Sequence, residues 1–132
     1  MKAVKQVYDF MDKAKVYSLA TIENDQPRVR IYGTTLLFED KLYIMAFDHT
    51  AAIDQLRANP KAEIAVFKGK QLRLTCKLVE DTRQELKDAM AAKMPALKAM
   101  AGKNNKNFIM LCVTDATATI ADLTGHSEIF TF

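Results

Sequence analysis

Two arginines two residues apart are the first feature of this sequence that could do chemistry. Arg28 and Arg30 lie in a stretch rich in β-branched residues, and a strand there would place both side chains on one face. Val29 and Ile31 would then point to the other face. Two guanidinium groups on one face of a sheet can hold a phosphate or a carboxylate through forked hydrogen bonds. Two solvated side chains on a sheet surface would show the same spacing, so both interpretations stay open.

The turn at Asp48, His49 and Thr50 is a second place where an anion could bind. It follows an expected strand and precedes an expected helix. The free N–H groups and the positive dipole end of a helix attract negative charge. Simple capping of the helix by Asp48 or Thr50 explains these residues equally well. Arg73, on the strand after Gly69, is a third cation that could close over a bound anion.

Several common classes of active site are missing from the sequence. Neither serine lies in a Gly-x-Ser-x-Gly motif, and the four glycines form no phosphate-binding loop. His49 and His126 have no partner at metal-ligand spacing, so we expect no metal site. Cys76 and Cys112 fall within expected strands, which favours buried packing residues over nucleophiles. An enzyme built on this chain would therefore depend on a borrowed cofactor.

Length and composition limit the architecture and the partners. The 132 residues, of which 49% are apolar and 27% charged, predict a single domain over residues 1–132. No apolar run approaches the roughly 20 residues of a membrane helix, and no secretory signal is visible. The two distant cysteines fit a cytoplasmic protein. A net charge of +3 is well short of what nucleic-acid binding requires, so we expect neither nucleic acid nor membrane as a partner.

Three helices are expected from hydrophobic periodicity and from helix signals. Residues 4–14 carry an apolar stripe at helical spacing, and residues 51–58 form a short helix that Pro60 cannot continue. A third helix is expected to start at the capping box formed by Thr82 and Glu85, and to be divided by Pro95.

Seven strands are expected around these helices, at residues 16–22, 28–38, 42–47, 62–67, 71–79, 108–120 and 127–132. Short polar connections join the first three, which predicts an antiparallel meander. Residues 102–107 are expected to form a polar loop. Mostly antiparallel strands with short helices at the edges point to a small β-barrel with helical additions.

Six segments in a fixed order carry a resemblance to a known family. They are residues 15–21, 26–33, 41–44, 55–64, 72–75 and 115–120. In this order they resemble the FMN-binding split-barrel family, the pyridoxamine-phosphate-oxidase-like proteins that include the nitroimidazole-resistance reductases. Each segment alone is degenerate, but their order is specific and covers nearly the whole chain.

The resemblance implies a mainly β, mostly antiparallel split barrel that forms a homodimer, with FMN in clefts between the two chains. The flavin would perform the redox chemistry, so the implied function is that of an FMN-dependent oxidoreductase acting on a small molecule, with no catalytic residue identified. The cofactor-binding residues implied in this way are Arg28, Arg30, Ile31 and Tyr32 on the second strand, Ala46, Phe47, His49 and Thr50 around the turn, and Gln71 and Arg73 after Gly69.

One departure from the family pattern keeps a second hypothesis open. Relatives commonly carry a small hydroxyl residue and then a lysine at the start of the short helix, where this chain has His49 and Thr50. Asp48 adds a negative charge beside the expected phosphate, and Phe47 replaces a small residue. The alternative is a non-catalytic split-barrel protein that has lost FMN, or that holds another anionic or haem-like ligand.

Overall fold

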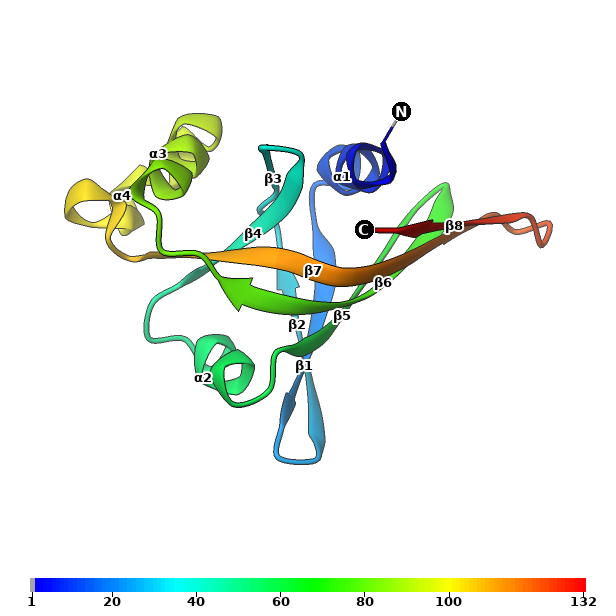
Figure 1. Cartoon of the computed structure of the whole chain (residues 1–132), viewed down its shortest axis with the longest axis horizontal. Helices are drawn as coiled ribbons and strands as arrows, with labels where there is room; N and C mark the ends of the chain where they lie inside the picture. Colours follow the sequence, from blue (N-terminus) through cyan, green and yellow to red (C-terminus); the bar gives the residue numbers. More distant parts are fainter. Residues whose placement is uncertain (1) are drawn as a thin grey trace.

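The centre of the structure is one eight-stranded sheet in which all the strand pairings are antiparallel. The computed structural model describes residues 2–132. The strand order is β2-β1-β5-β6-β7-β4-β3, and β8 pairs with β7 (Figure 1). The strands are β1 (Tyr17–Glu23), β2 (Gln26–Tyr32), β3 (Leu36–Phe38), β4 (Lys41–Phe47), β5 (Lys61–Lys68), β6 (Lys70–Glu80), β7 (Phe108–Ala121) and β8 (Ser127–Thr131).

Short helices lie around the sheet. They are α1 (Ala3–Ala14), α2 (Ala51–Ala58), α3 (Gln84–Lys93) and α4 (Lys98–Ala101), with 3₁₀ turns at Pro95–Leu97 and Lys103–Asn105. Figure 1 shows α3 and α4 together at one end of the sheet, and α1 and α2 on opposite sides of the long strands β6 and β7. The predicted fold class, mainly β and mostly antiparallel with short helices, is confirmed. Between residues 2 and 132, no helix is both long enough and apolar enough to cross a bilayer.

Strand β4 explains how the sheet supports two apolar clusters. Its residues from Leu42 to Ala46 are all buried, and successive side chains point to opposite faces. Ile44 packs in a cluster that includes residues of α1 and α2, whereas Tyr43 packs in one that includes residues of α3. Strand β6 behaves differently, because buried and exposed residues alternate along it and only one of its faces is covered.

The predicted strand over residues 28–38 and the predicted meander are both wrong. The chain leaves the sheet at Gly33–Thr35, so β2 and β3 are separate strands. β2 pairs with β1 at one end of the strand order, and β3 pairs with β4 at the other end. Thr34 stabilises this crossing: its hydroxyl accepts a hydrogen bond from the Met45 amide (2.9 Å), and its carbonyl accepts one from the Tyr17 hydroxyl (2.6 Å).

The helical corner after β6 also differs in detail from its prediction. The capping box at Thr82 and Glu85 is wrong, because Arg83 is the N-cap residue and no side chain caps the helix. Pro95 divides the helix as predicted, since it begins a 3₁₀ turn. The expected loop at residues 102–107 contains a second 3₁₀ turn.

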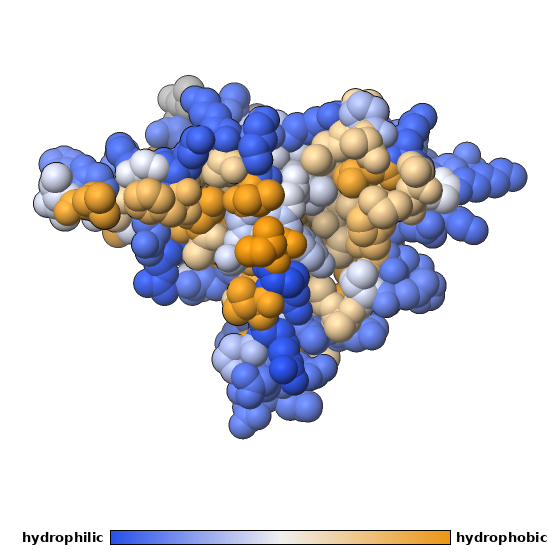
Figure 2. All heavy atoms as spheres, turned by 180° about the vertical axis from the view of Figure 1, so that it is seen from behind, coloured by the Kyte–Doolittle hydropathy of each residue, from blue (hydrophilic) through white to orange (hydrophobic). Residues whose placement is uncertain are grey.

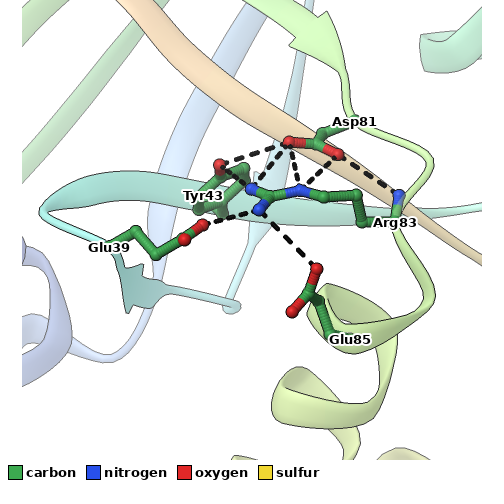
Figure 3. Close-up of polar contacts among 5 residues, drawn as sticks. All are labelled: Glu39, Tyr43, Asp81, Arg83 and Glu85. Carbon is green, nitrogen blue, oxygen red and sulfur yellow. Dashed lines mark hydrogen bonds and ion pairs between the residues drawn. The ribbon is translucent and has the colours of Figure 1, made fainter.

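Arg83 ties this corner to the β3–β4 hairpin (Figure 3). Its guanidinium lies 3.1 Å from an Asp81 carboxylate oxygen, 2.6 Å from a Glu39 oxygen and 3.1 Å from the Tyr43 hydroxyl. A Glu85 oxygen lies 3.7 Å away. Hydrogen bonding from Arg83 holds the pKa of the Asp81 carboxyl below its usual value. The members of this cluster are bonded to one another, so we interpret the cluster as a structural link between the two segments and not as a binding site.

Replacing Arg83 with methionine is expected to lower stability in a pH-dependent way. Because the folded pKa of Asp81 is lowered, its contribution is present above the unfolded pKa and is lost as the pH falls through the folded one. The stability gap between wild type and variant should therefore be full at neutral pH and shrink below about pH 3.8. Urea unfolding across a pH series measures the gap, with Arg57→Met, which removes the surface pair with Glu80, as the control. A stability difference that does not change with pH would contradict the role of the ionised Asp81 carboxylate in this cluster.

Candidate functional site

A groove with a volume of about 350 Å³ lies where β2, β4 and the corner after α3 meet. Small-molecule sites commonly measure about 300–1,000 Å³ and are mostly apolar with a few polar groups. This groove fits that description, since its lining consists of Ile31, Tyr32, Gly33, Thr34, Met45, Ala46, Phe47, Thr50, Met94 and Leu97. The structure thus brings together five of the residues predicted to bind a cofactor, namely Ile31, Tyr32, Ala46, Phe47 and Thr50.

The polar end of the groove lies at Tyr32 and Thr50. Both residues line it, and burial raises the pKa of Tyr32, whereas the charge of Arg30 and a hydrogen bond with Thr50 lower it. Thr50 is the N-cap residue of α2, yet its hydroxyl donates to the Phe47 carbonyl (2.9 Å) and does not cap the helix. The Arg30 guanidinium is hydrogen-bonded to Gln55 of α2, the helix whose N-cap residue Thr50 lines the groove. A guanidinium and a helix N-terminus without a side-chain cap both attract anions.

Arg28 and Arg30 share one face of β2, as predicted, but their surroundings differ. The neighbouring Val29 and Ile31 are exposed on the other face. Arg28 is exposed near the tip of the β1–β2 hairpin, where it pairs with Glu23 at 2.8 Å. Arg30 is half-buried and is hydrogen-bonded to side chains of β1 and α2. Of the two, Arg30 is nearer the groove along β2, because it immediately precedes the lining residues Ile31 and Tyr32.

Three further predicted residues lie away from the groove. His49 has a side chain that is 92% exposed, in a left-handed turn with φ of 66°, and it contacts Asp48 at 3.3 Å. Gln71 and Arg73 are on the exposed face of β6, and Arg73 pairs with Glu63 at 2.9 Å.

The strand register measures how far Arg73 is from the groove. Ile31 is paired with Ser18, Ser18 with Ala65, and Ala65 with Arg73. Three strand spacings of about 4.8 Å separate Ile31 from Arg73, roughly 14 Å in all. Gln71 and Arg73 therefore do not line the groove of their own chain.

Half of the groove lining was not predicted from the sequence. Gly33 and Thr34 reach it because the chain leaves the sheet between β2 and β3, and Met45 because β4 is buried on both faces. Met94 and Leu97 flank Pro95 at the corner after α3. Pro95 predicted a break in the helix, but nothing in the neighbouring sequence indicates that the residues around this break would line a groove.

Exposed apolar side chains border the groove on the β2 side. Val16, Val29 and Ile31 are 55%, 66% and 63% exposed. Figure 2 shows apolar side chains along the middle of this face, and again to the right of the middle, on the side of α3 and α4. Exposed apolar patches of this kind can mark interaction sites.

Known proteins resemble this chain over almost all of its length. The sequence profile of the pyridoxamine 5'-phosphate oxidase family matches residues 3–120. The structure of a NimC/NimA family protein from Clostridium acetobutylicum is 34% identical, with a TM-score of 0.92, and the match covers 98% of this chain and 92% of that one. No curated protein sequence matches significantly.

More distant structures share the fold alone. General stress protein 26 from Bacillus anthracis is 14% identical with a TM-score of 0.74, and the match covers 98% of both chains. The haem storage protein HutZ from Vibrio cholerae is 12% identical with a TM-score of 0.66, over 99% of this chain and 95% of that one. The predicted split-barrel fold is confirmed, and the chain belongs to the pyridoxamine 5'-phosphate oxidase family.

Proposed function

We propose that this chain binds FMN in the groove between β2 and β4, and acts as an FMN-dependent oxidoreductase on a small molecule. The observation that carries the proposal is the coincidence of two independent results. The residues expected along a flavin from the family resemblance include five that line the groove, and the polar end of the groove lies next to Arg30 and the start of α2.

The groove suits the two parts of FMN. Ile31, Met45 and Phe47 offer apolar surface to a flat aromatic ring, and the Tyr32 and Thr50 hydroxyls offer hydrogen bonds. Arg30 and the N-terminus of α2 suit the phosphate. When bound, FMN supplies the transfer of hydride or of single electrons. The chain's own part is then to orient the ring, hold the phosphate and exclude water.

Arg30 can also replace the lysine that this chain lacks at the start of α2. Relatives commonly place a lysine where this chain has Thr50, and no lysine lines the groove in the described residues. A guanidinium presents paired donors that match two phosphate oxygens, whereas a lysine presents a point charge. In this proposal Arg30 supplies the phosphate-binding cation, and Thr50 leaves the first N–H groups of α2 free of a side-chain cap.

A homodimer would complete the site. Ile31 forms one wall of the groove and is 63% exposed, so a single chain leaves that wall open to water. Ligand sites usually bury most of the ligand surface. A second chain covering Val16, Val29 and Ile31 would close the groove. It is also the route by which Gln71 and Arg73 of the second chain could approach the flavin.

Binding of haem, with or without loss of flavin chemistry, is the second candidate. The fold is shared with HutZ, a haem storage protein. Haem iron is usually held by histidine, cysteine, methionine or tyrosine. Among residues 2–132, neither a histidine nor a cysteine lines the groove, and its Met45, Met94 and Tyr32 are the ligand types left. We therefore favour FMN.

The purified protein is expected to be yellow, with the absorption spectrum of bound flavin. Flavin-free protein should quench FMN fluorescence on titration, because the ring leaves water and stacks on groove side chains. Anaerobic bleaching of the flavin by NADH or NADPH would then support oxidoreductase activity. A colourless protein that takes up no FMN, or one that takes up hemin in its place, would overturn the proposal.

A further inference from the structure

Thr21, Arg30 and Gln55 form a hydrogen-bonded cluster that joins β1, β2 and α2. Thr21 is 1% exposed and Gln55 is 6% exposed, and both are among the few polar side chains buried in the described structure. Buried polar groups are costly unless they are hydrogen-bonded. Thr21 faces the interior within β1, and Gln55 lies on the buried side of α2.

The hydrogen bonds of this cluster fix one end of the Arg30 guanidinium. The Thr21 hydroxyl donates to Gln55 Oε1 at 2.5 Å. Arg30 Nη1 donates to Thr21 Oγ1 at 2.7 Å, and Nη2 donates to Gln55 Oε1 at 2.7 Å. Nη1 also lies 3.2 Å from the Leu19 carbonyl oxygen. The two terminal nitrogens are therefore held by a matched pair of oxygens.

One edge of the Arg30 guanidinium is not used by this cluster. Within residues 2–132, neither Nε nor the second hydrogen on Nη2 takes part in any of these bonds. The Nε and Nη2 hydrogens lie side by side, so this edge can donate to two oxygens of a phosphate at once. Tyr32 lies two residues after Arg30 on β2 and therefore shares its face, and Tyr32 and Thr50 line the polar end of the groove.

Arg30 also differs from every other arginine of the chain in the charge of its partners. The other four form salt bridges with carboxylates: Arg28 with Glu23, Arg57 with Glu80, Arg73 with Glu63, and Arg83 with Asp81. In the described residues Arg30 has only neutral partners, a hydroxyl, an amide oxygen and backbone carbonyls. Its orientation is thus fixed without neutralising its charge.

We propose that Gln55 and Thr21 are positioning residues for an anion site at Arg30, and that this site takes the phosphate of FMN. The inference rests on the proposed function. Neutral oxygens hold the guanidinium in one orientation before the ligand arrives, so less free energy is lost in ordering it on binding. A carboxylate at residue 55 would hold the same nitrogens but would compete with the phosphate for their charge.

The test compares FMN with riboflavin, which has the same ring and lacks the phosphate. Both are titrated by fluorescence quenching against wild type, Gln55→Leu, Gln55→Glu, Thr21→Val and Thr21→Ser. We expect Gln55→Leu and Thr21→Val to weaken FMN binding roughly tenfold or more, and to leave riboflavin binding unchanged. Thr21→Ser should keep FMN affinity because it keeps the hydroxyl. Gln55→Glu should lose FMN affinity although it keeps the acceptor.

The outcomes separate this inference from the proposed function. Equal losses of FMN and riboflavin would mean that the cluster is only structural, and unchanged FMN affinity in all variants would also overturn the inference. Binding of neither flavin to wild type would overturn the proposed function. Calorimetric titration with inorganic phosphate then tests the anion site by itself: binding to wild type and not to Gln55→Glu supports the positioning role of Gln55, and no binding to wild type refutes the site. Thermal unfolding without ligand identifies any variant that fails to fold. If Gln55→Leu or Thr21→Val does not fold, the comparison of Thr21→Ser with Gln55→Glu still tests the inference, because both substitutions keep a polar oxygen at the site.

Discussion

Replacing Arg30 with methionine is expected to weaken FMN binding by about 2 kcal/mol or more, roughly thirtyfold in Kd. Methionine keeps much of the apolar stem but removes the paired donors and the charge. The change also leaves Thr21 and Gln55 without their guanidinium partner, so we expect a loss of stability of about 1–3 kcal/mol. Titration with FMN and urea unfolding of the flavin-free protein measure the two effects separately.

Two further variants make the Arg30 prediction specific. Arg30→Lys keeps the charge and loses the fork, so its FMN affinity should fall between those of wild type and Arg30→Met. Arg28→Met removes an arginine two residues away that is paired with Glu23 near the tip of the hairpin, and its effect should be small. If Arg28→Met matched Arg30→Met, the phosphate would have to lie nearer the tip of the hairpin than we propose.

In the proposed homodimer, replacing Ile31 with lysine is expected to convert the dimer to a monomer and to abolish flavin retention. The exposed face of β2 carries Val29 and Ile31, near Val16, and a lysine at its centre would bring a charge into the apolar interface of the proposed dimer. Since Ile31 also lines the groove, the same change should open the site to water. Light scattering and the flavin absorbance of the purified variant measure these two effects.

Leu123→Lys is the matched control for Ile31→Lys. Leu123 is an exposed apolar residue, 87% exposed, in the turn between β7 and β8, and it does not line the groove. The substitution Leu123→Lys should leave both the molecular mass measured by light scattering and the flavin content unchanged. A wild-type protein that is monomeric at micromolar concentration, or an Ile31→Lys variant that remains dimeric, would show that β2 is not the interface.

Local patterns predicted much of the fold, because their cause is local. The apolar stripe of residues 4–14 became α1, and residues 51–58 became α2 with the same bounds. Alternation along β2 placed Arg30 opposite Ile31, as expected from strand geometry. The break at residues 33–35 was missed because Thr34 is held by hydrogen bonds from Tyr17 and Met45, and both residues are distant from Thr34 in the sequence. Arg83 likewise depends on Glu39, 44 residues away.

The sequence by itself determined the fold class, the family and half of the groove lining, because periodicity and segment order are properties of the chain alone. Which cation is suited to an anion depends on how the elements pack together. Arg28, Arg30 and Arg73 are equivalent in type, but Glu23 and Glu63 pair with the first and the last. Thr21 and Gln55 hold Arg30 without a charge of their own, and α2 brings Gln55 to it from 25 residues away. Which residues become the partners of Arg30 depends on how the strands and the helix pack, and the spacing of residues in the sequence does not predict that.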